Sequence, residues 1–228
     1  MTATTLYWIL FIGVALASWI VSFSLERKFK RFSKVGLGMT GREVAEMMLH
    51  DHGIYDVQIT CIEGQLTDHY NPDTKTVNLS ESVYNGANVA AAAVAAHECG
   101  HAVQHAAEYA PLKMRSALVP VVSFSSKWMT WILLIGMFTL HIFPQLLLIG
   151  ICLFATTTLF SFITLPVEVN ASQRAVSWLR EAGITDNETT EMASDALHSA
   201  AYTYVVAALS SLATLIYYIL IFLGVSRR

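Results

Sequence analysis

The longest uncharged stretch of the chain covers residues 128–167, forty in all, without a single Asp, Glu, Lys or Arg. A helix that crosses a bilayer needs about 20 apolar residues, so this stretch is long enough for two crossings. Pro144 falls within His141–Gln145, where a proline can interrupt a helix and let the chain turn. The stretch therefore predicts a helical hairpin in a membrane, with spans over residues 128–143 and 146–165.

Two further stretches are uncharged and close to the length of a bilayer core, residues 6–23 and residues 201–224. The chain as a whole is 54% hydrophobic and only 14% charged, which is too apolar for an ordinary soluble domain. The N-terminal stretch lacks the basic start and the small-residue cleavage site of a signal peptide, so we interpret it as a retained anchor. We therefore expect a mainly α membrane protein with about four transmembrane helices.

A cluster of cations directly after the first span indicates the orientation of the chain. These cations are Arg27, Lys28, Lys30, Arg31 and Lys34. Because segments rich in Lys and Arg stay in the cytoplasm, residues 24–127 are expected there, and the hairpin returns residues 166–200 to the same side. Arg227 and Arg228 weigh against this orientation, since a fourth crossing would place them outside.

The polar segment between the first span and the hairpin predicts a small sheet and two helices on the cytoplasmic side. The expected elements are a helix over residues 40–50, strands over residues 56–62, 64–70 and 75–80, and an alanine-rich helix from Gly86 to Pro111. Thr40 and Glu43 have the spacing of a capping box, and the letters NPDT predict a turn before the last strand. No repeat or linker interrupts the chain, so we expect one domain over residues 1–228.

The alanine-rich helix carries the sequence HECGH, in which His97 and His101 are four residues apart. Residues at this spacing lie on one face of a helix, so both imidazoles can bind one zinc ion. Glu98 lies beside that face, where a glutamate can take a proton from a water that the metal activates. The alternative is a packing helix that carries histidines by coincidence, and the spacing and helical context favour the metal site. His105 is one turn too far along the axis for the same tetrahedral ion, so a solvated or core histidine is expected there.

Catalytic zinc requires a third protein ligand, and Glu168 is the first charged residue after the uncharged stretch. Pro166 is expected in the first turn of a helix that carries this glutamate. An ionisable residue at the end of a span has a high free-energy cost unless a partner stabilises it, and such residues commonly have a function. We therefore favour Glu168 as a ligand over a solvated interfacial carboxylate. The competing acids lie in a more polar segment that explains them as solvated charges. They are Glu181, Glu188, Glu191 and Asp195.

Peptide-bond hydrolysis also needs a donor to the tetrahedral oxyanion, for which Arg174, His198 and Tyr202 are candidates. Each has a simpler structural interpretation: a surface ion-pair residue, a histidine on a helix face and a tyrosine at the membrane interface, respectively. Residues 75–80 are a candidate for binding an extended substrate by strand addition, with an ordinary hairpin as the equal alternative.

Three segments of the sequence resemble one family: HECGH, the later PVEVNASQRA and the earlier LTDHYNPDTKTVNLSESVYNG. With the two intervening transmembrane helices, they resemble the neutral zinc metallopeptidases of the YugP type, bacterial membrane proteins that are also similar to the HtpX-like proteases. The resemblance implies a gluzincin-like site with His97, His101 and Glu168 on Zn2+ and Glu98 as the base. In the HtpX-like proteases an aspartate with a supporting role follows the third ligand by four residues, and Ser172 stands at that position here.

These observations favour a zinc-dependent endopeptidase of the bacterial cytoplasmic membrane, with its active site facing the cytoplasm and a polypeptide as substrate. A metal-sensing or scaffolding membrane protein without catalysis is the alternative, and transport is disfavoured because the spans carry no ionisable residue apart from His141. A nucleic-acid partner is not expected, since the net charge is −3 and the cations cluster near the first span. Three cysteines without a CxxC pair predict neither a disulfide framework nor a cysteine zinc site.

Overall fold

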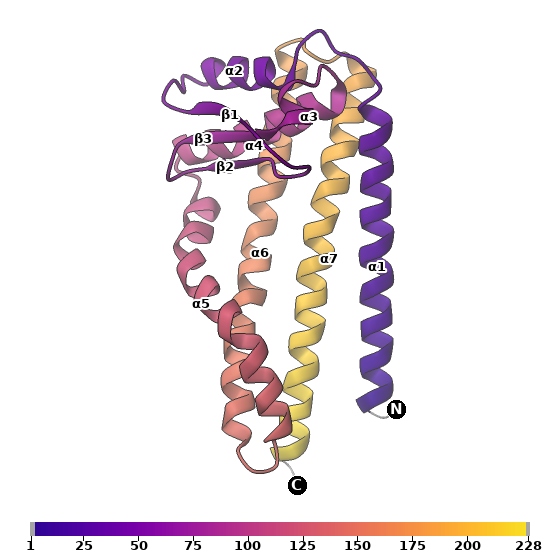
Figure 1. Cartoon of the computed structure of the whole chain (residues 1–228), viewed down its shortest axis with the longest axis vertical. Helices are drawn as coiled ribbons and strands as arrows, with labels where there is room; N and C mark the ends of the chain where they lie inside the picture. Colours follow the sequence, from indigo (N-terminus) through magenta and orange to yellow (C-terminus); the bar gives the residue numbers. More distant parts are fainter. Residues whose placement is uncertain (1–2, 227–228) are drawn as a thin grey trace. The chain divides into compact units, whose positions relative to one another are not determined.

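The computed structural model describes residues 3–226, so Arg227 and Arg228 lie outside the described residues. The chain is mostly helical and carries one small sheet (Figure 1). It divides into two compact units. Val21–Lys113 and Pro166–Tyr202 form one of them, which we call the site unit, and the rest of the chain forms the helical unit.

Within residues 3–226, four helices are long and apolar enough to cross a membrane, as the sequence predicted. They are α1 (Ala3–Phe32), α5 (Ala110–Phe138), α6 (Pro144–Glu181) and α7 (Asn187–Ser226). The chain turns between α5 and α6, and Pro144 is the first residue of α6, where its missing N–H breaks no helical hydrogen bond. The expectation that Pro166 opens a new helix was wrong: Pro166 lies inside α6, because the apolar run before it is already helical.

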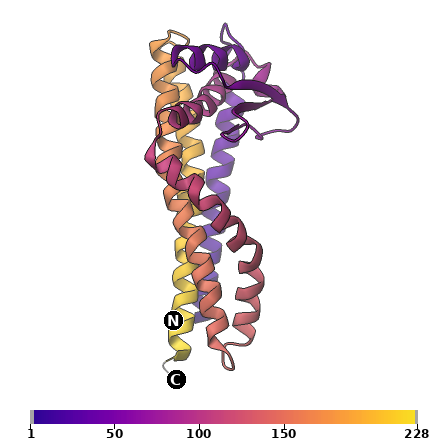
Figure 2. The same ribbon diagram turned by 90° about the vertical axis from the view of Figure 1, so that its left-hand side faces the viewer.

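The helical unit has its own small core, centred on the fully buried Leu147 of α6. A Cβ atom added at Gly136 of α5 would lie 2.7 Å from the Cα of Leu147, so only glycine permits this close approach of the two helices. The hydroxyls of Thr158 and Ser211 hydrogen-bond across α6 and α7 at 2.7 Å. Small residues and hydroxyl pairs of this kind hold helices together where no hydrophobic effect is available. Helix α5 carries Pro120 and bends along its length (Figure 2).

The sheet of the site unit contains three strands in the order β1-β3-β2. Strand β1 (Gln58–Ile62) pairs with β3 (Thr76–Ser80) in parallel, and β2 (His69–Asn71) pairs with β3 antiparallel through the expected NPDT turn. The strand expected over residues 64–70 is limited to its last two residues and Asn71. Its first part forms a loop because Gly64 and Leu66 have φ values of +110° and +57°, which an extended strand does not allow.

Three helices lie wholly within the site unit: α2 (Gly41–Asp51), α3 (Glu81–Tyr84) and α4 (Val89–Ala106). Helix α2 begins with the predicted capping box between Thr40 and Glu43. Helix α4 is capped by the side chain of Asn88, which accepts a hydrogen bond from the N–H of Ala91. The small residues of α4 let α2 pack closely over it, and the Cys99 thiol lies fully buried there, 3.6 Å from the carbonyl oxygen of Ala45. The sheet and these helices enclose the core that supports α4.

Candidate metal centre

The structure brings together the side chains of His97, His101 and Glu168, which the sequence places on two distant helices. Helix α4 supplies both histidines, and α6 supplies the glutamate. Nε2 of His97 lies 3.2 Å from Oε2 of Glu168, and Nε2 of His101 lies 3.5 Å from the same oxygen. One ligand atom from each residue lies within 4.8 Å of the other two.

This donor set fits a zinc ion in both chemistry and size. Two imidazole nitrogens and one carboxylate oxygen form a known ligand set for catalytic zinc, which leaves a fourth position open. Zinc binds such atoms at about 2.0–2.1 Å, so two ligand atoms on a tetrahedral ion are separated by roughly 3.3 Å. The two nitrogen–oxygen separations, 3.2 Å and 3.5 Å, match that value.

A glycine in the HECGH sequence allows the two helices to approach closely. A Cβ atom at Gly100 would lie 2.7 Å from the backbone oxygen of Ala171 and 3.2 Å from its Cα. Ala171 itself is fully buried. Because neither residue has a large side chain, the backbones of α4 and α6 come close enough for Glu168 to reach the histidines.

A buried glutamine fixes the orientation of His101. Gln104 is fully buried, and its Nε2 donates hydrogen bonds to the carbonyl oxygen of Val167 at 2.8 Å and to Oδ1 of Asn170 at 3.0 Å. Its Oε1 must therefore face Nδ1 of His101, 3.1 Å away, and accept a hydrogen bond from it. With the proton on Nδ1, the lone pair of Nε2 points to the metal position, as a ligand histidine requires.

His97 has a corresponding partner on α6. Its Nδ1 lies 3.1 Å from Oγ of Ser172, one turn after Glu168. The hydroxyl oxygen can accept a hydrogen bond from the Nδ1–H of His97, which keeps the proton on Nδ1 and leaves the lone pair of Nε2 for a metal. Ser172 is buried, so this contact with His97 is shielded from solvent.

The cluster is largely removed from solvent, which strengthens its electrostatic interactions. The exposed fraction of the side chain is 4% for Glu168 and 10% for His101. Burial by itself lowers the pKa of His101, but the hydrogen bond with Glu168 and the charge of Glu98 raise that pKa above its ordinary value. A bound cation would occupy the place of this proton between His101 and Glu168.

Glu98 is held beside the cluster by the sheet. Its Oε2 accepts a hydrogen bond from the backbone N–H of Tyr70 in β2 at 3.0 Å, and only 8% of the residue is exposed. Strand β2 is at the edge of the sheet, so this N–H is directed away from β3. The edge strand and the glutamate are therefore direct neighbours.

The other predicted residues differ in how they relate to the cluster. Arg174 donates from Nε to Asn170 at 2.8 Å and so joins the hydrogen-bonded chain through Gln104. His198 is exposed and bonds Ser194 of its own helix at 3.3 Å, and Tyr202 is 60% exposed. His105 is exposed outside the cluster and hydrogen-bonds the hydroxyl of Tyr70 at 2.8 Å. Among the competing acids, Asp195 pairs with Lys28 at 2.6 Å.

Two contributors were missed by sequence reasoning. Gln104 is a polar residue one turn after His101 on a helix that is otherwise rich in alanine, and that isolated polarity was an available signal. The N–H of Tyr70 had no sequence signal, because any residue at that strand position would supply it.

Comparisons with known proteins assign the chain to a family. A family model described as "Putative neutral zinc metallopeptidase" matches residues 7–223. The chain is 40% identical over 214 residues to "Putative membrane protease YugP" of Bacillus subtilis (strain 168), which covers 93% of this chain and 94% of that protein. No solved structure matches the chain. The matches support a protease role, and Zn2+ is the cofactor expected for the family. Over nearly its whole length, the chain belongs to the neutral zinc metallopeptidase family.

Proposed function

We propose that the protein is a membrane-embedded endopeptidase that hydrolyses peptide bonds with zinc held by His97, His101 and Glu168. The observation that carries this proposal is the convergence of two imidazole nitrogens on one carboxylate oxygen, at the spacing of a tetrahedral ion. The neighbouring Glu98 distinguishes a catalytic centre from a site that only binds a metal, because a structural site needs no additional base.

Bound zinc supplies Lewis-acid activation of the attacking water and of the scissile carbonyl. Glu98 accepts a proton from that water as its oxygen bonds to the carbonyl carbon. Glu98 then delivers the proton to the departing amine nitrogen when the carbon–nitrogen bond breaks. The N–H of Tyr70 holds Oε2 of Glu98, which leaves Oε1 for the proton transfer. Arg174, His198 and Tyr202 remain candidates for stabilising the oxyanion.

The free edge of β2 is the place where an extended substrate can approach this glutamate. Strand addition at residues 75–80, which the sequence suggested, is not available because β3 is the central strand and pairs on both sides. Strand β2 has a partner strand on one side only, and on its other side the N–H of Tyr70 bonds Glu98. A substrate that pairs there lies beside the base and the metal ligands.

We also infer that the site faces the cytoplasm of a bacterial cell, with the protein in the cytoplasmic membrane. The support is the set of five cations between Arg27 and Lys34, which follows the first apolar stretch. Lys28 lies in the site unit and pairs with Asp195, so the cationic end of α1 is part of the same unit as the metal cluster.

The Glu98→Gln variant tests the catalytic role. It keeps the size of the side chain and removes the base, so we expect one zinc per chain and a fall in kcat of about 100- to 10,000-fold. Zinc content by metal analysis and cleavage of an unstructured protein substrate are measured on the same sample. Glu108→Gln is the matched control, since Glu108 lies just after α4 with an exposed carboxylate that pairs with Lys113.

The same experiment separates the enzyme from a metal sensor or scaffold. A non-catalytic metal binder has no cleavage to lose, and Glu98→Gln would leave its function intact. Normal cleavage by the Glu98→Gln variant would contradict the proposal, as would the absence of cleavage by the zinc-loaded wild type.

A further inference from the structure

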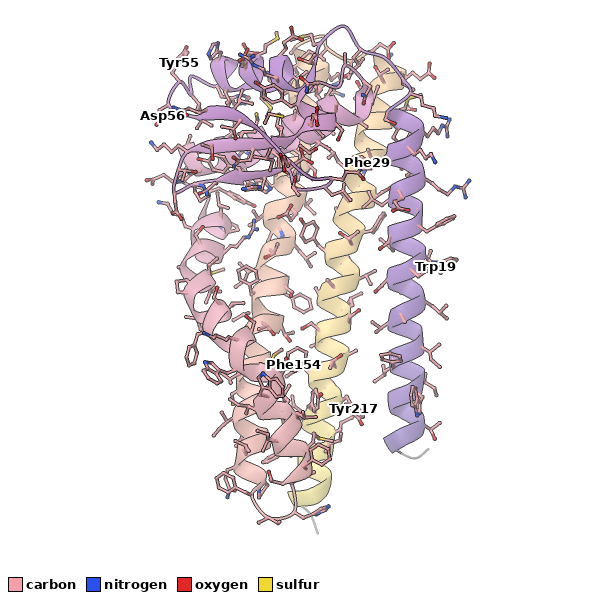
Figure 3. The ribbon with its side chains drawn as sticks, in the orientation of Figure 1. Trp19, Phe29, Tyr55, Asp56, Phe154 and Tyr217 are labelled. Atoms are coloured by element: carbon pink, nitrogen blue, oxygen red, sulfur yellow. The ribbon has the colours of Figure 1, made fainter. Side chains whose placement is uncertain are left out.

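An apolar pocket of about 600 Å³ lies in the site unit, outside the metal cluster. Its walls come from the end of α1, from the loop before β2 and from the first turns of α4. The apolar side chains that line it include Leu25, Phe29, Leu66, Val83, Ala91 and Val94. Phe29 of α1 is labelled in Figure 3. The volume is within the range of small-molecule and side-chain binding pockets in proteins.

Helix α4 connects this pocket to the metal ligands. Within Val89–Gln104, which the structure describes throughout, only Val94 and His97 are partly exposed, and every other residue is buried. The two residues are three positions apart, so they are neighbours on one helix face. Val94 lines the pocket and His97 belongs to the cluster. Val94 and His97, the partly exposed residues on this face of α4, therefore connect the pocket to the metal position.

Strand β2 makes a second, independent connection. The loop residues Leu66 and Asp68 line the pocket, and the chain then enters β2 at His69. The next residue, Tyr70, donates its N–H to Glu98. An extended chain that lies along β2 toward Glu98 thus passes the mouth of the pocket.

Two polar residues that line the pocket, Ser80 and Asp68, are paired with each other. Ser80 is buried and donates from its N–H to Oδ1 of Asp68 at 2.7 Å, and its hydroxyl lies 3.0 Å and 3.1 Å from the two oxygens of that carboxylate. Glu26 and Lys30, also at the pocket, are exposed and of opposite sign. An apolar side chain that entered would be buried against Leu25, Phe29 and Val94 and would gain from that burial.

Leu66 has an unusual conformation for a pocket residue. Its φ is +57°, a region that a branched side chain rarely adopts, and 77% of its surface is exposed. An exposed leucine at the edge of an apolar pocket adds contact area for a bound apolar group.

We propose that this pocket binds one large apolar side chain of the polypeptide substrate, next to the bond that is cleaved. The inference rests on the proposed peptidase function and adds a specificity to it. Because α1 forms one wall, the membrane-anchor helix contributes directly to the choice of substrate.

The test is a series of zinc-loaded wild-type assays with peptides that differ at one position beside the cleaved bond. With Leu or Phe at one such position, we expect kcat/KM to be about 10- to 100-fold higher than with Gly, Asp or Lys. Equal rates for all residues at every position tested, or a preference for Lys or Asp, would overturn the inference.

Two variants link that preference to the pocket. Leu66→Asp places a charge at its edge, and Val94→Phe fills it from the partly exposed face of α4. Each is expected to lower the Leu-to-Gly ratio of kcat/KM at least tenfold. Because the ratio compares two substrates on one protein sample, partial unfolding does not change it. Tyr55→Asp is the matched control, since Tyr55 is 76% exposed and lies at the far end of the site unit from Phe29 (Figure 3).

A parallel binding measurement separates this inference from the proposed function. The Glu98→Gln variant, loaded with zinc, should bind the Leu peptide at least tenfold more tightly than the Gly peptide by fluorescence anisotropy. Cleavage without any preference among the peptides would contradict the pocket assignment and leave the peptidase function standing. Absence of cleavage of every peptide would contradict both the peptidase function and this inference. A ratio that Leu66→Asp leaves unchanged, with loss of co-purified lipid instead, would identify the pocket as a lipid site.

Discussion

At the scale of single residues, the metal cluster depends on a glutamine that no catalytic motif includes. Gln104 is expected to act as a positioning residue, because its Oε1 fixes the His101 proton on Nδ1. In the Gln104→Ala variant, we expect the affinity for zinc to fall about 10- to 100-fold, as for other partners of ligand histidines. Competition with a zinc chelator measures this affinity. The control is Gln173→Ala, an exposed glutamine on α6, and equal affinities in the two variants would show that Gln104 plays no such part.

At the scale of helices, Gly100 lies at the contact between α4 and α6, where close packing and helix propensity favour different residues. Alanine in a helix is favoured over glycine by about 1 kcal/mol, yet Gly100→Ala would place a Cβ 2.7 Å from a backbone oxygen that no side-chain rotation can move. Overpacking of this kind costs about 1–3 kcal/mol, so it outweighs the propensity.

We therefore expect Gly100→Ala to move α6 away from α4 and to reduce zinc content well below one per chain. Metal analysis, with circular dichroism to check that the helices remain, measures the outcome. Gly13→Ala is the comparison, because a Cβ at Gly13 of α1 meets nothing within 4 Å. Full zinc occupancy in Gly100→Ala would mean that the close approach is not required for the cluster.

At the scale of the whole molecule, the proposed orientation makes a prediction for a natural cysteine. Cys61 is exposed on β1 in the site unit, whereas Cys99 is buried. If the site unit faces the cytoplasm, a membrane-impermeant maleimide should label Cys61 in inverted membrane vesicles and not in intact cells. Cys61→Ser identifies the labelled site. Labelling of Cys61 in intact cells would reverse the orientation.

The sequence predicted the four long helices and the small sheet because length, apolar composition and turn residues are local signals. Spacing along one helix also singled out His97 and His101, and the first charge after the hairpin singled out Glu168. Their roles as ligands, like the single domain over residues 1–228, stay predictions. The partners of the histidines were harder to find, because Gln104 meets Val167 across 63 positions of sequence. The loop at Leu66 was mistaken for a strand because left-handed backbone leaves no trace in hydrophobic alternation.

The buried thiol of Cys99 has a consequence for oxidative conditions. Burial first, and the neighbouring charge of Glu98 second, raise the pKa of this thiol, so the reactive thiolate is suppressed. A cysteine reacts with peroxides and disulfides when its thiolate attacks them from an accessible position, and Cys99 offers neither the charge nor the access. A sulfur atom between the proposed base and the second histidine thus behaves as an inert apolar group. Cys99 therefore gives oxidants no exposed thiolate within the HECGH sequence.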